Sequence, residues 1–189
     1  HSDISTFSLH PLKTITTGEG GIVTTNYKKL DDRLKKSRSL GIEKNKKKHW
    51  DYDVVSLGLN FRLNDFQCAL GISQLKRIRS FLSSRKKIAD VYIKNLKKIN
   101  SIIIPSHNKK YKSSNHLFLI SIKKASYKLK EKFIKYMLKN KIVLQYHYIP
   151  IYKFKNFKGK FIGNNSEIYY HSCISLPIYV NMTKKEQNF

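Results

Sequence analysis

The segment SLHPLKTITTGEGG, from Ser8 to Gly21, constrains the backbone of this chain more than any other stretch. The proline after His10 fixes its own φ and biases the histidine away from a helical conformation. The three glycines near the end of the segment let the backbone take up strained turns and approach a ligand closely. The pattern predicts a turn that feeds an extended segment, with Lys13 held between them.

Lys13 has unusual surroundings for a lysine, although most lysines in a chain with 38 Lys and Arg residues are solvated surface charges. Nearby hydroxyl side chains can hydrogen-bond an anionic group: Ser8, Thr14, Thr16 and Thr17. Desolvation and nearby positive charge make a neutral amine available to attack a carbonyl, so the segment predicts a lysine that can form a Schiff base. The glycine spacing matches neither a dinucleotide-binding motif nor a P-loop, and the strand-like sequence IVTT follows.

Three sequence blocks, in the same order, resemble the sugar aminotransferases of the DegT/DnrJ type. They are FSLHPLKTITTGEGG, then GLNFRLNDFQCALGISQLKRI at Gly58–Ile78, then LQYHYIPIY at Leu144–Tyr152, with ISLPIYVNMTKKEQNF closing the chain. The resemblance implies an α/β fold, namely fold type I of the pyridoxal-phosphate-dependent transferases, similar to aspartate aminotransferase. It implies that residues 1–80 are part of the large cofactor domain and that residues 81–189 form a small C-terminal α/β domain.

Within this family, NFRLNDFQCALGISQL, SSNHL at Ser113–Leu117 and YHYIPIY are most similar to the transaminases of pseudaminic acid biosynthesis. The resemblance implies that L-glutamate donates an amino group to a UDP-linked 4-keto-6-deoxy sugar, with pyridoxal 5′-phosphate as the cofactor. It also implies a homodimer with shared active sites, while the two widely separated cysteines, Cys68 and Cys173, predict a reducing, cytoplasmic setting. Family members are roughly twice as long as this chain, since a fold type I large domain plus a small domain exceeds a single typical domain. We therefore expect a C-terminal piece that is inactive alone.

The resemblance assigns roles to three residues. Lys13 would bind the cofactor and act as the catalytic base, and Ser8 would contact the cofactor phosphate. Asn60 would reach across the dimer to the partner's cofactor phosphate, so that two subunits build each active site. Without the resemblance, Ser8 could satisfy a local backbone group and Asn60 could be an ordinary turn residue.

Four further residues are candidates for substrate binding. Arg62 could clamp a phosphate or carboxylate group, or it could form an ion pair that caps the preceding loop. His147 and Tyr148 lie in a block that contacts the nucleotide sugar in relatives, whereas aromatic residues of strands more often pack in a core. His10 could orient the substrate, and a structural hydrogen bond is its alternative role.

The formal net charge of +26 would by itself suggest a nucleic acid or an anionic membrane as partner. Lysine is spread through every segment and accompanies abundant Ile, Asn, Tyr and Phe, a pattern typical of AT-rich coding sequence, so we expect neither partner. The alternative is a basic RNA-binding module without enzymatic activity, because Tyr146–Phe161 interleaves aromatic residues with lysines. No apolar run approaches the roughly 20 residues that span a bilayer.

Cys68 and Cys173 match no metal or redox spacing, so we expect no metal site, and Cys68 is expected to pack in an apolar helical stretch. Residue patterns predict strands at 20–25, 117–122 and 142–148, and helices at 27–40, 63–99 and 127–140, with a possible break of the second helix near 79–84. Asn26 and Asn64 are the expected N-caps, and Gly41 is the expected end of the first helix.

Overall fold

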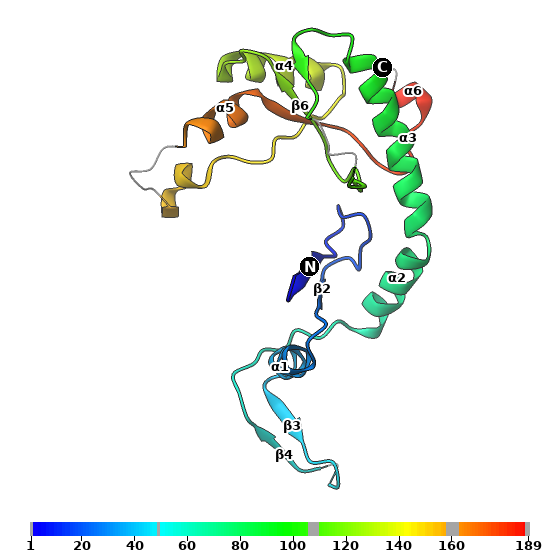
Figure 1. Ribbon diagram of the computed structural model, residues 1–189, viewed down its shortest axis with the longest axis vertical. Helices are drawn as coiled ribbons and strands as arrows, with labels where there is room; N and C mark the ends of the chain where they lie inside the picture. The colour runs from blue at the N-terminus through cyan, green and yellow to red at the C-terminus, as the bar shows by residue number, and fades with distance from the viewer. Residues whose placement is uncertain (1, 49, 106–109, 158–162, 188–189) are drawn as a thin grey trace. The chain divides into compact units, whose positions relative to one another are not determined.

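The computed structural model describes residues 2–48, 50–105, 110–157 and 163–187, and the chain divides into two compact units between Ile78 and Arg79 (Figure 1). The elements of the first unit are β1 (Ser5–Ser8), β2 (Gly21–Thr24), α1 (Lys28–Arg38), β3 (Ile42–Lys44), β4 (Tyr52–Val54) and α2 (Asp65–Lys76). The elements that follow are α3 (Ile78–Leu96), β5 (Ile102–Ile103), β6 (Phe118–Ile122), α4 (Tyr127–Lys139), the 3₁₀ turns η1 (Ile151–Lys153) and η2 (Lys155–Phe157), α5 (Asn164–Ser172), β7 (Cys173–Leu176) and α6 (Lys184–Gln187).

The first unit has almost no interior. Its strands form two antiparallel pairs, β1 with β2 and β3 with β4. Among its described residues only Leu9, Thr17 and Gly41 are buried, and neither α1 nor α2 contains a buried residue. Because hydrophobic burial is the main favourable term in folding, this unit has little of its own to stabilise it.

The second unit has a core. Its sheet is antiparallel in the order β5-β6-β7, and the buried cluster consists of Ala89, Phe118, Ile120, Leu144 and Ile174. Partly buried residues of α3 and α4 pack against this cluster. The cluster thus joins two helices, two strands and the segment after α4 around one interior.

Lys130 of α4 is buried in the second unit with 2% of its surface exposed. Its Nζ donates to the carbonyl oxygen of Tyr170 and lies 4.9 Å and 4.5 Å from the ring centroids of Tyr146 and Tyr170. Burial lowers the pKa of Lys130, because the surrounding protein solvates the ammonium less well than water does.

We expect Lys130 to make a contribution to the stability of the second unit that rises with pH in the alkaline range. The raised pKa values of five tyrosines in the same unit act in the opposite direction, so the contribution of Lys130 has to be measured as a difference between variants. These tyrosines are Tyr92, Tyr152, Tyr169, Tyr170 and Tyr179. Between the lowered pKa of Lys130 in the folded chain and the ordinary lysine pKa of about 10.4, the unfolded chain binds more protons, so raising the pH favours folding. Urea denaturation at a series of pH values should show that Lys130→Met makes the slope of unfolding free energy against pH less positive than in the unaltered protein. Lys132→Met, which changes an exposed lysine of the same helix, is the control. Equal slopes in the two variants would contradict this account.

Several predicted elements are confirmed with shifted ends: β2, α1, β6 and α4 lie within the predicted ranges. Asn64 is confirmed as the N-cap of α2, where its side chain accepts from the Gln67 N–H while Gln67 Oε1 accepts from the Asn64 N–H. The long helical stretch is divided at Arg77, earlier than the predicted break, and α3 ends at Leu96.

Two predictions about local structure are wrong. The N-cap of α1 is Tyr27 rather than Asn26, because the carbonyl of Tyr27 accepts the first helical hydrogen bonds and no side chain caps the helix. Residues 142–148 form no strand. Only Gln145 pairs there, through one antiparallel bridge to Ser175 of β7, and the pairing does not extend to its neighbours.

The expectation that Cys68 packs in an apolar environment is also wrong for the described residues, since Cys68 is exposed on α2. The helix carries the apolar residues that the pattern requires, but nothing in the described part of the unit covers them. Cys173, by contrast, is buried in β7.

Candidate functional site

The loop from Leu9 to Gly20 connects β1 to β2 and carries Lys13. Leu9 is buried, and its backbone closes the loop on itself. Its N–H donates to the carbonyl oxygen of Gly20 at 2.9 Å, while its own carbonyl accepts from the Thr17 N–H at 3.0 Å and from Thr16 Oγ1 at 2.9 Å. Both ends of the loop are thereby fixed on the β1–β2 pair.

Lys13 follows a tight turn, as the sequence predicts. Its N–H donates to the carbonyl oxygen of His10 at 2.9 Å, and Pro11 occupies the second position of the turn, where a fixed φ near −65° fits. The side chain of Lys13 is half-buried, and it makes no hydrogen bond or ion pair with any residue that the structure describes. A lysine amine is thus presented on an ordered loop without an acidic partner in the described chain.

His10 bridges the two sides of this loop. Its Nδ1 accepts from the Leu12 N–H at 3.3 Å, and its Nε2 lies 3.8 Å from Glu19 Oε1. Ser8 is the last residue of β1, and its Oγ accepts from the His10 N–H at 3.4 Å. Ser8 and His10 therefore both make the local backbone hydrogen bonds that were considered as their structural roles. Ser8 is exposed, and its hydroxyl can still donate a hydrogen bond.

The loop is anchored to α2. Gln67 Nε2 donates to the carbonyl oxygen of Glu19 at 3.1 Å, and Thr17 Oγ1 donates to the same oxygen at 2.7 Å. A Cβ on Gly20, whose φ is +142°, would lie 2.7 Å from Leu63 Cδ2 and from Thr17 Oγ1. Glycine at this position allows the loop to pack directly against the start of α2.

Asn60 and Arg62 lie on the segment between β4 and α2, which runs antiparallel to the end of α1. The Leu59 N–H donates to Ser37 O at 2.8 Å, and the Phe61 N–H donates to Arg38 O at 2.9 Å. Asn60 and Arg62 are exposed, and within the described ranges their side chains have no hydrogen-bond or ion-pair partner. The ion pair considered for Arg62 is therefore not observed among these residues.

The position of this segment depends on two glycines in close contact. Gly41 has a φ of +70°, and a Cβ there would lie 1.7 Å from the carbonyl oxygen of Ser56. A Cβ on Gly58 would lie 2.3 Å from the backbone nitrogen of Gly41. Larger residues at either position would push the segment that carries Asn60 and Arg62 away from α1.

We expect Gly41→Ala to loosen this segment by about 2 kcal/mol or more, because the variant combines left-handed backbone strain with a clash against backbone. Hydrogen exchange at the amides of Leu59 and Phe61 should accelerate accordingly. Gly18→Ala is the control, since Gly18 also has a positive φ, +82°, but its Cβ would meet no atom within 4 Å. If Gly18→Ala accelerated these two amides equally, the close contact would not be the cause.

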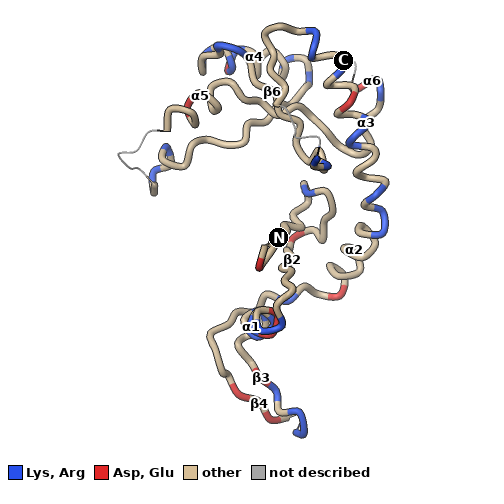
Figure 2. Tube along the Cα trace, viewed as in Figure 1, with Lys and Arg blue, Asp and Glu red and all other residues tan. Residues whose placement is uncertain are grey.

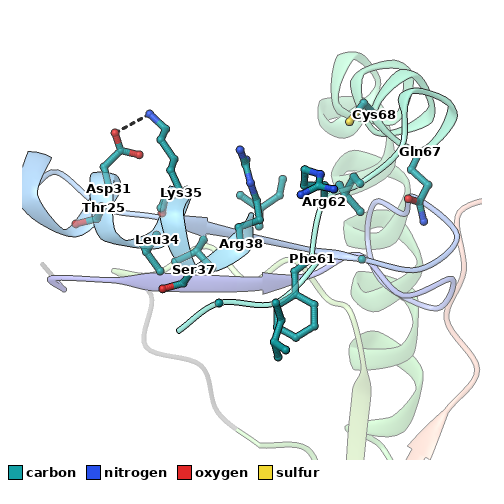
Figure 3. Close-up of a pocket in the computed structure, with 18 of the residues that line it drawn as sticks. Thr25, Asp31, Leu34, Lys35, Ser37, Arg38, Phe61, Arg62, Gln67 and Cys68 are labelled. Atoms are coloured by element: carbon teal, nitrogen blue, oxygen red, sulfur yellow. Dashed lines mark hydrogen bonds and ion pairs between the residues drawn. The ribbon is translucent and has the colours of Figure 1, made fainter. Parts of the chain in front are cut away.

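A hollow of about 1270 Å³ opens in the first unit between β2, α1, the segment 57–63 and the start of α2 (Figure 3). Arg62 lines it, together with Arg38, Lys35, Asp31 and Gln67. Arg38 was not among the residues predicted from sequence, because an arginine in the last turn of a helix is common and gives no signal of its own.

His147 and Tyr148 belong to the second unit, whereas the other five candidates belong to the first. His147 Nδ1 lies 2.7 Å from the Oγ of Ser175, a buried residue of β7. Tyr148 is 71% exposed, and its ring meets that of His147 edge-on at 4.8 Å between centroids. Tyr148 also lines a second, smaller hollow beside Pro150 and Tyr169. The exposure of Tyr148 does not fit the core role considered for it.

Lys and Arg residues are spread over both units, as Figure 2 shows. No helix within the described ranges is long and apolar enough to cross a membrane. Nor does any cluster of three or more His, Cys, Asp and Glu side chains suited to a metal ion occur among those residues.

The sequence matches the model of the DegT/DnrJ/EryC1/StrS aminotransferase family over residues 1–188. It is 40% identical to the UDP-4-amino-4,6-dideoxy-N-acetyl-beta-L-altrosamine transaminase of Campylobacter jejuni, over 100% of this chain and 50% of the relative. It is 38% identical to the protein of the same name from Helicobacter pylori, over 94% of this chain and 48% of the relative. The chain therefore spans about half the length of these curated relatives.

Comparison with solved structures also finds sugar aminotransferases, again over about half of their length. Helicobacter pylori PseC, described as an aminotransferase involved in the biosynthesis of pseudoaminic acid, matches with a TM-score of 0.92 and 35% identity, over 99% of this chain and 51% of PseC. The PLP-form of the putative sugar aminotransferase Spr1654 from Streptococcus pneumoniae matches with a TM-score of 0.89 and 25% identity, over 99% and 49% of the two chains. The predicted fold class is confirmed for the part of the fold that this chain contains, and nothing in these matches supports an RNA-binding module.

Proposed function

Because this chain belongs to the DegT/DnrJ/EryC1/StrS aminotransferase family, we propose that it supplies the cofactor lysine and part of the substrate site of a pyridoxal-phosphate-dependent transaminase. The reaction transfers the amino group of L-glutamate to a UDP-linked 4-keto-6-deoxy sugar, in cell-surface polysaccharide or nonulosonic acid biosynthesis. The observation that carries the proposal is the half-buried side chain of Lys13, which lies on an ordered loop and makes no hydrogen bond or ion pair with the described residues. The 40% identity of the chain to a transaminase of this kind supports it.

The residues of the loop fit pyridoxal phosphate by their chemistry. The cofactor has an aldehyde, which needs an uncharged primary amine, and a phosphate, which needs hydrogen-bond donors. Lys13 has a primary amine that makes no hydrogen bond or ion pair with the described residues, and Ser8 at the start of the same loop has a hydroxyl that can still donate. Gly18 leaves open space beside the loop, since a Cβ there would meet no atom of the described residues within 4 Å.

Lys13 would hold the cofactor through Nζ and, once released by the amino donor, would carry a proton between the substrate carbon and the cofactor. The cofactor supplies an electron sink when it is bound. Ser8 Oγ would donate to a phosphate oxygen. The hydrogen bonds of Leu9 and Gln67 keep the loop in place, so that Nζ returns to the same position in each half of the reaction.

Asn60 and Arg62 would bind anionic groups outside the loop, and we assign Asn60 to the cofactor phosphate of a second subunit. Each active site would then require a homodimer. His147, Tyr148 and His10 would contact the nucleotide sugar. We further assign residues 1–80 to the large domain and residues 81–189 to the small domain of a cytoplasmic enzyme.

The proposal can be tested with the full gene product that carries this sequence. After incubation with pyridoxal phosphate, L-glutamate and a UDP-linked 4-keto-6-deoxy-hexosamine, we expect 2-oxoglutarate and the 4-amino sugar to form in equal amounts. The control replaces the keto sugar with UDP-N-acetylglucosamine, which lacks the keto group. Failure to produce 2-oxoglutarate from glutamate by cofactor-loaded protein would refute the transaminase assignment.

A further inference from the structure

Two arginines, Arg38 and Arg62, line the hollow of the first unit without an acidic partner among the described residues. Arg38 is the last residue of α1, and Arg62 lies two residues before the N-cap of α2. Both line the hollow, and neither guanidinium group makes a hydrogen bond or an ion pair with any residue that the structure describes. Two like charges in one depression repel each other unless an anion joins them.

The backbone holds these arginines close together. The Phe61 N–H donates to the Arg38 carbonyl at 2.9 Å, and Ser39 bridges to Asn60. Figure 3 shows the side chains of Arg38 and Arg62 on the same side of this pairing, while Phe61 points to the other side. The two guanidinium groups therefore face the same space.

The nearby carboxylates are already engaged. Asp31 lines the hollow but accepts from Lys35 Nζ at 2.7 Å, as Figure 3 shows, and Glu19 pairs with His10 at 3.8 Å. Glu43 pairs with Lys36 outside the hollow. Neither of the two carboxylates that line the hollow is thus left unpaired, and both arginines are open to an anionic ligand.

We propose that Arg38 and Arg62 together bind a phosphate group of a ligand in this hollow. The planar fork of each guanidinium matches two phosphate oxygens, and two forks on one group fix its position as well as its charge. Gln67, which also lines the hollow, adds an amide. The inference rests on the proposed function for the identity of the ligand, because that function offers two sources, the cofactor phosphate and the diphosphate of the nucleotide sugar.

The test measures binding of inorganic pyrophosphate to the full gene product by calorimetry. Arg38→Gln and Arg62→Gln should each raise the dissociation constant about tenfold, which corresponds to about 1.4 kcal/mol. The double variant should lose less than the sum of the two single effects, because both groups act on one phosphate. Arg38→Lys should bind with intermediate affinity, since it keeps the charge and loses the fork.

Arg33→Gln is the matched control for the general effect of positive charge. Arg33 is exposed on the same helix and does not line the hollow, yet its removal lowers the net charge by the same amount. A chain with a net charge of +26 attracts anions non-specifically, so the comparison of Arg33→Gln with Arg38→Gln separates that attraction from binding at the hollow. An equal loss in Arg33→Gln and Arg38→Gln, or no binding by the unaltered protein, would overturn the inference.

Repeating the measurement with cofactor-loaded protein identifies the source of the phosphate. If loading with the cofactor prevents pyrophosphate from binding at the arginine-dependent site, the site binds the cofactor phosphate. If pyrophosphate binds the loaded protein as before and UDP competes with it, the site binds the diphosphate of the nucleotide sugar. The inference and the proposed function can fail separately. Transaminase activity with unaltered pyrophosphate binding in Arg38→Gln would remove the inference alone, and arginine-dependent binding without amino transfer would remove the function alone.

Discussion

Lys13→Ala should abolish the covalent attachment of pyridoxal phosphate to this protein. The expected adduct requires a primary amine that is free to reach the aldehyde, and the side chain of Lys13 makes no hydrogen bond or ion pair with the described residues. Reduction with borohydride followed by peptide mass spectrometry should place the cofactor on the peptide that contains Lys13. Amino transfer should fall by about 10²–10⁴-fold from the loss of proton transfer alone.

Two further variants separate chemistry from charge. Lys13→Arg keeps a positive charge on the loop but has no amine able to bond the aldehyde, so it should also fail to form the adduct. Lys29→Ala removes an exposed lysine of α1 and should leave the adduct unchanged. Labelling of many lysines to similar extents, with no preference for Lys13, would show ordinary surface reactivity and contradict the assignment.

The local signals of the sequence predict the backbone turn before Lys13 well. Pro11 predicts the turn, because proline restricts its own backbone in any surroundings, and Asn64 with Gln67 predicts the start of α2 for a similarly local reason. Such features involve residues close together in the chain. They depend little on what the rest of the fold supplies.

The features that the sequence does not predict depend on distant partners. Residues 142–148 have the alternation of a strand, but only Gln145 pairs with β7. Cys68 has the neighbours of a buried residue, but its helix is uncovered in the described unit. Arg38 becomes a candidate only because the end of α1 pairs with the segment of Arg62, more than twenty positions later. Periodicity shows which face of an element is apolar and leaves open what packs against it.

Ile174→Ala should destabilise the second unit by about 2–5 kcal/mol, the usual cost of an Ile-to-Ala change in a core. Ile174 has no exposed surface, and it lies opposite Ile120, which is 1% exposed, in the register of β7 with β6. Removing its side chain leaves a cavity between the sheet and the helices that pack on it. The amides of β6 and β7 should then exchange roughly a hundredfold faster, which corresponds to about 3 kcal/mol.

Ile22→Ala is the matched control, because Ile22 lies in β2 of the first unit and is 43% exposed in the chain described here. Its cost should be about 1 kcal/mol or less, as for most surface substitutions. The single tryptophan, Trp50, lies in the first unit, whereas hydrogen exchange reads the amides of β6 and β7 directly and is the suitable probe. If Ile22→Ala were as destabilising as Ile174→Ala, then β2 would be covered by protein outside the described residues, and its exposure here would not reflect the assembled enzyme.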